Sequence, residues 1–278
     1  MNSGRNLEKI YGLVVRHFYS LLSVARVFCF GDRQKKSVLF FTLHKCASSL
    51  FAGYALKTDR HRVHIDYARK IYKGRNPAVS FREVGRVYGP IRVSSPEGGP
   101  VYEHLVEPFS KSEFLADKTV AIFVRDPRDI LVSSYFSFGF THGLSNVPSI
   151  AAREVATKSK IQSMSIDEYA IQEVGQMKRN FEKLVSISKR AEVFTILRYE
   201  DMVKNWDEFS RDYKQVLDIS DTDLQKIHRK SRPRVRESAG SHKRSGKVEG
   251  FRSKLRPETI ESINTVIESE LRFFGYEL

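Results

Sequence analysis

The stretch VLFFTLHKCASS, residues 38–49, joins a short apolar run to a polar turn. The run Val38 to Leu43 has the length and the aromatic and β-branched content of a strand with both faces covered. The turn His44 to Ser49 then offers small and polar residues from which a helix can begin. A buried strand that passes directly into a helix is typical of a parallel sheet in an α/β protein.

The same strand pattern occurs twice more, as TVAIFV over Thr119 to Val124 and VFTIL over Val193 to Leu197. After the first of these, Asp126 is a natural N-cap and Pro127 suits the first helical position. Strands that alternate with helices predict a single α/β domain with a central parallel β-sheet flanked by helices.

Capping residues mark two further helices. Ser165 and Glu168 form a capping box that begins a long helix ending at about Arg190. Pro257 begins the last helix, and Gly275 is its expected stop.

The composition fits a folded protein that lacks a disulfide framework. The 278 residues are 41% hydrophobic and 12% aromatic, which excludes disorder and collagen and is enough for a sizeable core. Cys29 and Cys46 are the two cysteines of the sequence. Because secreted domains are often cross-linked, this usage predicts a reducing compartment and a cytoplasmic location.

The chain is basic, and its positive charge is concentrated near the C-terminus. Lysine and arginine number 47 against 33 acidic residues, a net charge of +14. Residues 226–256 carry twelve Lys and Arg against Glu237 and Glu249, and 12 − 2 leaves +10. A solvated face, nonspecific attraction of nucleic acid and binding of a small anion all fit such a run. Phe251 is its only aromatic residue, so a stacking platform for single-stranded nucleic acid is missing, and no specific nucleic-acid partner is predicted.

The N-terminal segment has an amphipathic character. Residues 10–30 carry an apolar stripe at helical spacing, but Arg16 and Arg26 interrupt it. Each would cost about 2.5 to 3.5 kcal/mol at a bilayer centre, so a spanning helix is not expected. Two interpretations stay open, a helix packed on the domain and a helix in peripheral contact with an anionic membrane. We therefore divide the chain into an N-terminal amphipathic helical segment, residues 1–35, and one domain, residues 36–278.

The strand ends suggest where a ligand binds. The three predicted strands lead into Lys45, into Arg125, and into Arg198 with Tyr199. Ligands of parallel sheets bind beyond the carboxyl ends of the strands. Cations at three such ends predict a site for an anion with more than one charged group.

The turn after the first strand could cradle a phosphate-type group. It offers the Lys45 ammonium and the hydroxyls of Ser48 and Ser49 next to a helix N-terminus. It lacks the glycines and the spacing of a Walker A loop, which weakens an interpretation as an ATPase. A polar turn without a ligand is the alternative.

Two motifs together resemble the sulfotransferases that use 3′-phosphoadenosine 5′-phosphosulfate (PAPS). The turn His44 to Ser49 is similar to their 5′-phosphosulfate loop, with Lys45 and the Ser48/Ser49 pair matching. Arg125 followed eight residues later by Ser133 resembles their 3′-phosphate motif. The resemblance implies a P-loop nucleotide-kinase-like fold, PAPS as sulfuryl donor without a required metal, and a hydroxyl acceptor.

Three further segments extend the resemblance. Val101 to Leu105, which contains His104, is similar to the segment that carries the family's base, and Tyr199-Glu200-Asp201 to its strand end. Arg244-Ser245-Gly246-Lys247 resembles its C-terminal loop. The implied catalytic residues are Lys45 and His104. The implied cofactor-binding residues are Lys45, Cys46, Ala47, Ser48, Ser49, Arg125, Ser133, Tyr199, Arg244, Ser245 and Gly246.

The sequence departs from the family pattern mainly where adenine would pack. Leu50 and Phe251 stand where the family often has Trp, and Ser245 where Lys is common. His44 and Ala47 replace the usual Pro and Gly. Most of the cationic positions are retained, so the resemblance supports anion binding more than any contact to the base.

The chemistry assigned to these residues follows from their types. A Lys45 ammonium can stabilise negative charge that grows on a leaving phosphate. A neutral imidazole can take the proton of an attacking hydroxyl, which favours His104 as base, with Glu103 and Glu107 as substitutes. Cys46, beside Lys45 at a helix N-terminus, is expected to have a lowered pKa.

The segment from Tyr135 to Gln162 contains several Gly, Ser and Pro residues and is interpreted as a mobile lid or a surface loop. Phe136, Phe138 and Phe140 at its start would suit a hydrophobic or glycolipid acceptor, whereas the basic residues 61–92 would suit an acidic glycan. A P-loop phosphotransferase, a noncatalytic nucleic-acid binder and a noncatalytic sulfotransferase-like protein are the alternative functions.

Overall fold

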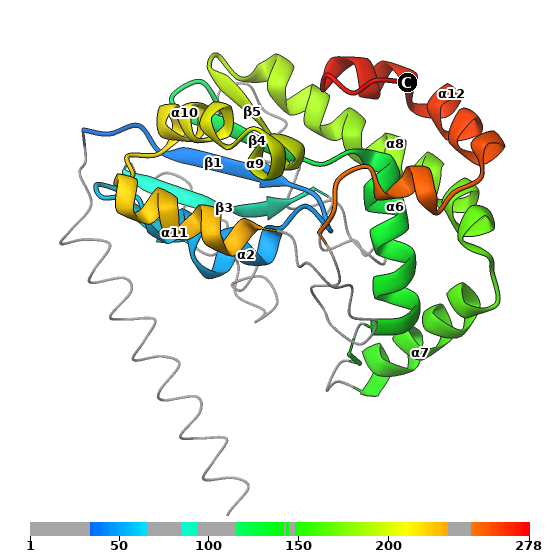
Figure 1. Cartoon of the computed structure of the whole chain (residues 1–278). Helices are drawn as coiled ribbons and strands as arrows, with labels where there is room; N and C mark the ends of the chain where they lie inside the picture. The colour runs from blue at the N-terminus through cyan, green and yellow to red at the C-terminus, as the bar shows by residue number, and fades with distance from the viewer. Residues whose placement is uncertain (1–33, 66–84, 94–114, 142, 145–147, 233–245) are drawn as a thin grey trace, which may run out of the picture.

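A five-stranded sheet forms the centre of the computed structural model (Figure 1). The structure describes residues 34–65, 85–93, 115–141, 143–144, 148–232 and 246–278. The strand order is β2-β3-β1-β4-β5, and all four neighbouring pairs are parallel. The strands are β1 (Val38–Thr42), β2 (Val63–Ile65), β3 (Arg86–Arg92), β4 (Thr119–Val124) and β5 (Phe194–Arg198). The prediction of a single α/β domain with a parallel sheet is confirmed.

Helices flank this sheet. The α-helices are α2 (Ser48–Gly53), α6 (Pro127–Phe136), α7 (Pro148–Gln162), α8 (Ile166–Arg190), α9 (Tyr199–Lys204), α10 (Trp206–Val216), α11 (Asp221–Ser231) and α12 (Pro257–Phe273). Short 3₁₀ turns are η1 (Ala55–Lys57) and η5 (Gly250–Ser253), and η4 (Ser137–Thr141) is a π-helix. Helix α8 packs against both α6 and α12, while α2 contacts β3 and α10 contacts β4 and β5.

The core is aromatic on the side of the sheet that α2 and α10 cover. All five residues of β1 are buried, as expected of a strand with both faces covered. The ring of Phe51 lies 4.6 Å from that of Phe40 and 4.4 Å from that of Phe123, and the Phe123 ring is 6.2 Å from that of Phe209. This cluster packs α2 and α10 against the strands.

The predicted helix starts are confirmed. The Asp126 side chain accepts a hydrogen bond from the backbone N–H of Arg128, with Pro127 at the first helical position. Ser165 and Glu168 make both bonds of the capping box. Helix α12 begins at Pro257, and Gly275 follows its end with a positive φ of 74°.

Strand β3 was not anticipated, because Gly89 and Pro90 interrupt its apolar pattern. The structure gives a physical reason for the glycine. A Cβ at position 89 would lie 2.8 Å from the carbonyl oxygen of Phe40 on the neighbouring strand. Glycine therefore allows β3 to approach β1 closely, and a residue that resembles a strand breaker belongs to the sheet.

The interpretation of Tyr135 to Gln162 as a loop is wrong for most of its length. Helix α6 continues into the π-helix η4, and α7 ends the segment. Gly139 is one of the residues that suggested a loop, but its missing side chain instead permits η4 and α7 to pack closely. A Cβ at position 139 would lie 2.8 Å from Cγ2 of Ile161. The Gln162 amide donates to the Gly139 carbonyl at 2.8 Å, which ties α7 to η4.

The predicted N-terminal amphipathic segment falls almost entirely on residues 1–33, outside the described residues. Among the residues that the structure does describe, no helix has the length and apolar character needed to cross a membrane.

Candidate functional site

The carboxyl ends of β1, β4 and β5 bring Lys45, Arg125 and Tyr199 together, but the third predicted cation, Arg198, instead pairs with Asp201 at 2.7 Å and donates to the Gly275 carbonyl at 3.0 Å. The Arg125 guanidinium donates to the carbonyl oxygen of Lys45 at 3.4 Å. Its central carbon lies 4.6 Å from the centroid of the Tyr199 ring. The arrows of β1 and β3 point toward α6 (Figure 1), whose first residue, Pro127, follows Arg125 by two positions.

The Lys45 turn has a strained backbone. Lys45 and Ala47 have positive φ values of 64° and 48°, a region that residues other than Gly, Asn and Asp seldom adopt. Such strain is of order 1–3 kcal/mol per residue and clusters at functional sites. Of the two serines of the following helix, Ser48 is buried and Ser49 is exposed.

The Lys45 ammonium is held between polar and aromatic groups. It donates to the Ser137 hydroxyl at 2.7 Å and lies 5.7 Å from the centre of the Phe138 ring. Burial, together with the positive charges of Arg125 and then Arg92, lowers the pKa of Lys45 to about 8. A lysine in such a field is well placed to bind an anion, because the anion would relieve the repulsion among the cations.

The expectation that Cys46 has a lowered pKa is wrong. Its side chain is fully buried, and this burial raises the pKa of the thiol to about 12. Although Arg125 acts in the opposite direction, desolvation is the larger effect. The thiol therefore lies in the core, where it donates to the His44 carbonyl of the same turn at 3.6 Å.

Arg125 is the centre of the site. Its guanidinium pairs with Asp129 at 3.4 Å and donates to the carbonyl oxygen of Lys247 at 2.9 Å. Within the described part of the chain, the Arg125 Nε is buried and has no hydrogen-bond partner. A buried donor without a partner is costly, so an anion bound here would satisfy it.

Ser133 lies on α6 two turns beyond Arg125 and is half-buried. Its carbonyl accepts a bond from the backbone N–H of Ser137, the residue that holds Lys45. Residues four apart lie on the same helix face. Ser133 and Ser137 therefore share a face of this helix.

Tyr199 and Glu200 connect the site to the end of the chain. The Tyr199 hydroxyl donates to the Gly246 carbonyl at 2.6 Å. Glu200 accepts from the backbone N–H of Asp126 and from the Tyr276 hydroxyl, each at 3.0 Å. Burial raises the pKa of Glu200 to about 7. Gly246 thus contacts Tyr199 at the site, and Glu200 is an addition to it.

Three predicted site residues, His104, Arg244 and Ser245, lie outside the described residues. Other residues at the site were missed. Asp129 has a sequence signal, because it lies in the first turn of the helix that follows Arg125, four positions after it. Ser137 lies in the π-helix η4 and Arg92 at the end of strand β3, and neither element is expected from the sequence.

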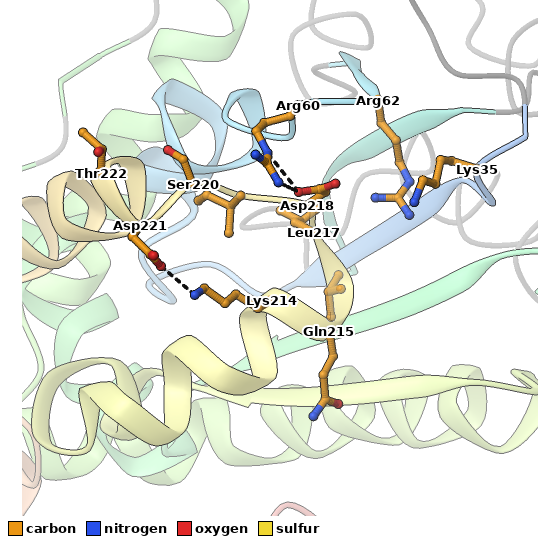
Figure 2. A pocket seen from close by; sticks show the side chains of 12 residues that line it. Lys35, Arg60, Arg62, Lys214, Gln215, Leu217, Asp218, Ser220, Asp221 and Thr222 are labelled. Carbon is orange, nitrogen blue, oxygen red and sulfur yellow. Dashed lines mark hydrogen bonds and ion pairs between the residues drawn. The ribbon is translucent and has the colours of Figure 1, made fainter.

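A hollow of about 770 Å³ lies away from this site, where α10 leads into α11 (Figure 2). None of the predicted site residues lines it. Three of its cations are already paired with carboxylates: Lys214 with Asp221 at 2.6 Å, Arg62 with Asp59 at 2.8 Å, and Arg60 with Asp218. Its charge is therefore largely neutralised. No group of three or more His, Cys, Asp or Glu in the described ranges could hold a metal ion.

Comparisons with known proteins give one family. The model of the sulfotransferase domain matches residues 94–275. A search of curated proteins found no match. Similar solved structures include a mouse sulfotransferase complexed with PAP, at 14% identity and a TM-score of 0.49, covering 90% of this chain and 88% of that one. Another is retinol dehydratase in complex with androsterone and the inactive cofactor PAP, at 14% identity and a TM-score of 0.46, covering 93% and 86%.

Proposed function

The chain belongs to the sulfotransferase domain family, and we propose that it transfers a sulfuryl group from PAPS to a hydroxyl group of an acceptor. The observation that carries this proposal is the cluster of Lys45, Arg125 and Tyr199 at one edge of the sheet. These side chains come from three strand ends that are far apart in the sequence. A cluster of this kind suits a ligand with two anionic ends.

Arg125 and Ser133 would hold the 3′-phosphate of the donor, with Gly246, Arg244 and Ser245 on the neighbouring loop. The buried Nε of Arg125, which has no partner among the described residues, supports this assignment. A planar guanidinium can form two parallel bonds to a phosphate. Tyr199 would hold that guanidinium by lying against its face.

The Lys45 turn would hold the 5′ end, where the sulfuryl group is transferred. Backbone groups of Cys46 and Ala47 and the hydroxyls of Ser48 and Ser49 are the proposed contacts to its oxygens. The left-handed backbone at Lys45 and Ala47 supports this role, because turns with such residues can form a concave site in which backbone N–H groups bind an anion.

The reaction forms one sulfur–oxygen bond to the acceptor and breaks the one to the phosphate of the donor. Negative charge grows on the departing phosphate oxygen, and the Lys45 ammonium would stabilise it. Loss of one preorganised donor of this kind typically slows a reaction by about a hundred- to a thousandfold.

His104 would accept the proton of the acceptor hydroxyl, with Glu103 and Glu107 as the substitutes. A neutral imidazole is suited to this step near neutral pH, and general-base catalysis contributes about a hundred- to ten-thousandfold. The assignment rests on the resemblance of Val101 to Leu105 to the family's segment.

The Phe138 ring beside Lys45 favours an acceptor with an apolar body. The ring of Phe136 lies 6.2 Å from that of Phe140, which is 46% exposed. We therefore place hydrophobic alcohols ahead of acidic glycans as acceptors.

The test is a transfer assay with PAPS that carries a labelled sulfuryl group, in EDTA, with steroid alcohols, phenols and acidic glycans as acceptors. We expect label in a hydroxyl acceptor, and transfer that is about a hundred- to a thousandfold slower with Lys45→Ala. Phosphorylation of these acceptors from ATP and Mg²⁺, with no transfer from PAPS, would contradict the proposal.

A further inference from the structure

Asp129 lies at the centre of the site with an almost completely buried side chain, which makes two hydrogen bonds and one ion pair. One carboxylate oxygen accepts from the backbone N–H of Glu249 at 2.9 Å and pairs with Arg125 at 3.4 Å. The other oxygen accepts from the backbone N–H of Phe251 at 3.0 Å. A single side chain of α6 thus joins the key arginine to a segment 120 residues later in the chain.

That segment, Gly246 to Phe251, is held from a second side as well. Its Gly246 carbonyl accepts from the Tyr199 hydroxyl at 2.6 Å. The Lys247 carbonyl accepts from the same nitrogen of Arg125 that pairs with Asp129, at 2.9 Å. Arg125 and the segment are therefore fixed relative to each other by direct bonds and through Asp129.

The backbone of the segment needs such support. Gly246 and Glu249 have positive φ values of 67° and 58°. Glycine adopts this region freely, but glutamate does so only when its surroundings impose it. The bond from the Glu249 N–H to Asp129 is one constraint that imposes it.

Resting on the function proposed above, we propose that Asp129 is a positioning residue for recognition of the 3′-phosphate of the donor. It makes Arg125 and the segment Gly246 to Phe251 a single anion-binding unit. As a carboxylate it would repel a phosphate, so it acts through the guanidinium and the backbone.

A residue that only stabilised the fold would behave differently from a positioning residue. Loss of a structural residue lowers the affinity for all nucleotides alike. Loss of Asp129 should instead lower the affinity for adenosine 3′,5′-bisphosphate and leave that for AMP, which lacks the 3′-phosphate. The ratio of the two affinities therefore separates the explanations.

The experiment is calorimetry of both nucleotides with the wild type, Asp129→Asn and Asp167→Asn. Asp167 is a matched control, because it too is a buried aspartate that accepts a backbone N–H, from Arg256 at 2.9 Å, and pairs with the Arg256 side chain. In Asp129→Asn one carboxylate oxygen is replaced by an amide NH₂ group, which cannot accept the hydrogen bond from the backbone N–H that faces it. The charge partner of Arg125 is also lost. We expect the bisphosphate-to-AMP ratio to fall by about tenfold or more, because hydrogen bonds to charged groups are strong. We expect no change of the ratio in Asp167→Asn.

A ratio that is unchanged in Asp129→Asn would overturn the inference. A wild type without preference for the bisphosphate would instead contradict the proposed function itself. If Asp129→Asn does not fold, hydrogen exchange of the wild type tests the same point. Saturating bisphosphate should slow exchange of the Glu249 and Phe251 amides more than saturating AMP does, and equal protection would overturn the inference.

Discussion

The guanidinium of Arg125 lies over the ring of Tyr199, with 4.6 Å between its central carbon and the ring centroid. The two residues directly follow the neighbouring parallel strands β4 and β5. The Tyr199 hydroxyl also reaches the C-terminal segment through Gly246. One tyrosine therefore orients the main cation of the site and anchors the loop beside it.

Tyr199→Phe separates these two roles, because it keeps the ring below Arg125 and removes the bond to Gly246. A neutral hydrogen bond contributes about 0.5 to 1.5 kcal/mol. We expect the affinity for adenosine 3′,5′-bisphosphate to fall by about two- to tenfold, measured by calorimetry. Tyr199→Leu, which also removes the ring, should cost more, and equal losses in the two variants would contradict a role for the ring.

Nucleotide binding should weaken as the pH rises through about 8, the value to which burial and neighbouring cations lower the pKa of Lys45. Below this pH the ammonium is charged and attracts the anion, whereas above it the side chain is neutral. A bound anion favours the charged form, so binding near pH 8 should take up a proton, which calorimetry in buffers of different ionisation enthalpy detects. Lys45→Arg should abolish this pH dependence, and its persistence in that variant would assign it to another group.

His104→Ala should remove turnover and retain nucleotide affinity, since a base acts on the acceptor hydroxyl and not on the donor. The expected loss of rate is about a hundred- to ten-thousandfold. Glu103→Gln and Glu107→Gln are the comparison variants, and both should stay active. A fully active His104→Ala enzyme would transfer the assignment to one of these glutamates.

Gly139→Ala should destabilise the protein, because the added Cβ would lie 2.8 Å from Cγ2 of Ile161. Overpacking of this kind costs about 1–3 kcal/mol. Gly143→Ala is the control, since a Cβ there has no neighbour within 4 Å. Thermal or denaturant unfolding measures both, and equal stability of the two variants would contradict the packing of α7 on η4.

The sequence predicts the parts of the molecule that depend on local pattern. Strands β1, β4 and β5, the caps at Asp126 and Ser165, and the meeting of Lys45 with Arg125 all follow from apolar runs and strand-to-helix turns. Parallel strands place their carboxyl ends at one edge, so local signals are sufficient there.

The remaining features depend on contacts between distant segments. Gly89 and Gly139 resemble breakers in the sequence, yet each permits the close approach of another element. The pKa of Cys46 was wrongly predicted, because its position beside Lys45 gave no sign that the thiol points into the core. The contacts of Asp129 with Glu249 and Phe251 join residues about 120 positions apart. Such pairs carry no periodic signal.

The most direct test of a site that binds a donor with two anionic ends is calorimetry of the wild type in EDTA with adenosine 3′,5′-bisphosphate, AMP and ATP. The proposed donor site predicts that the bisphosphate binds most tightly, and that Arg125→Ala removes most of its advantage over AMP. Equal affinity for the three nucleotides, or a preference for ATP, would contradict it.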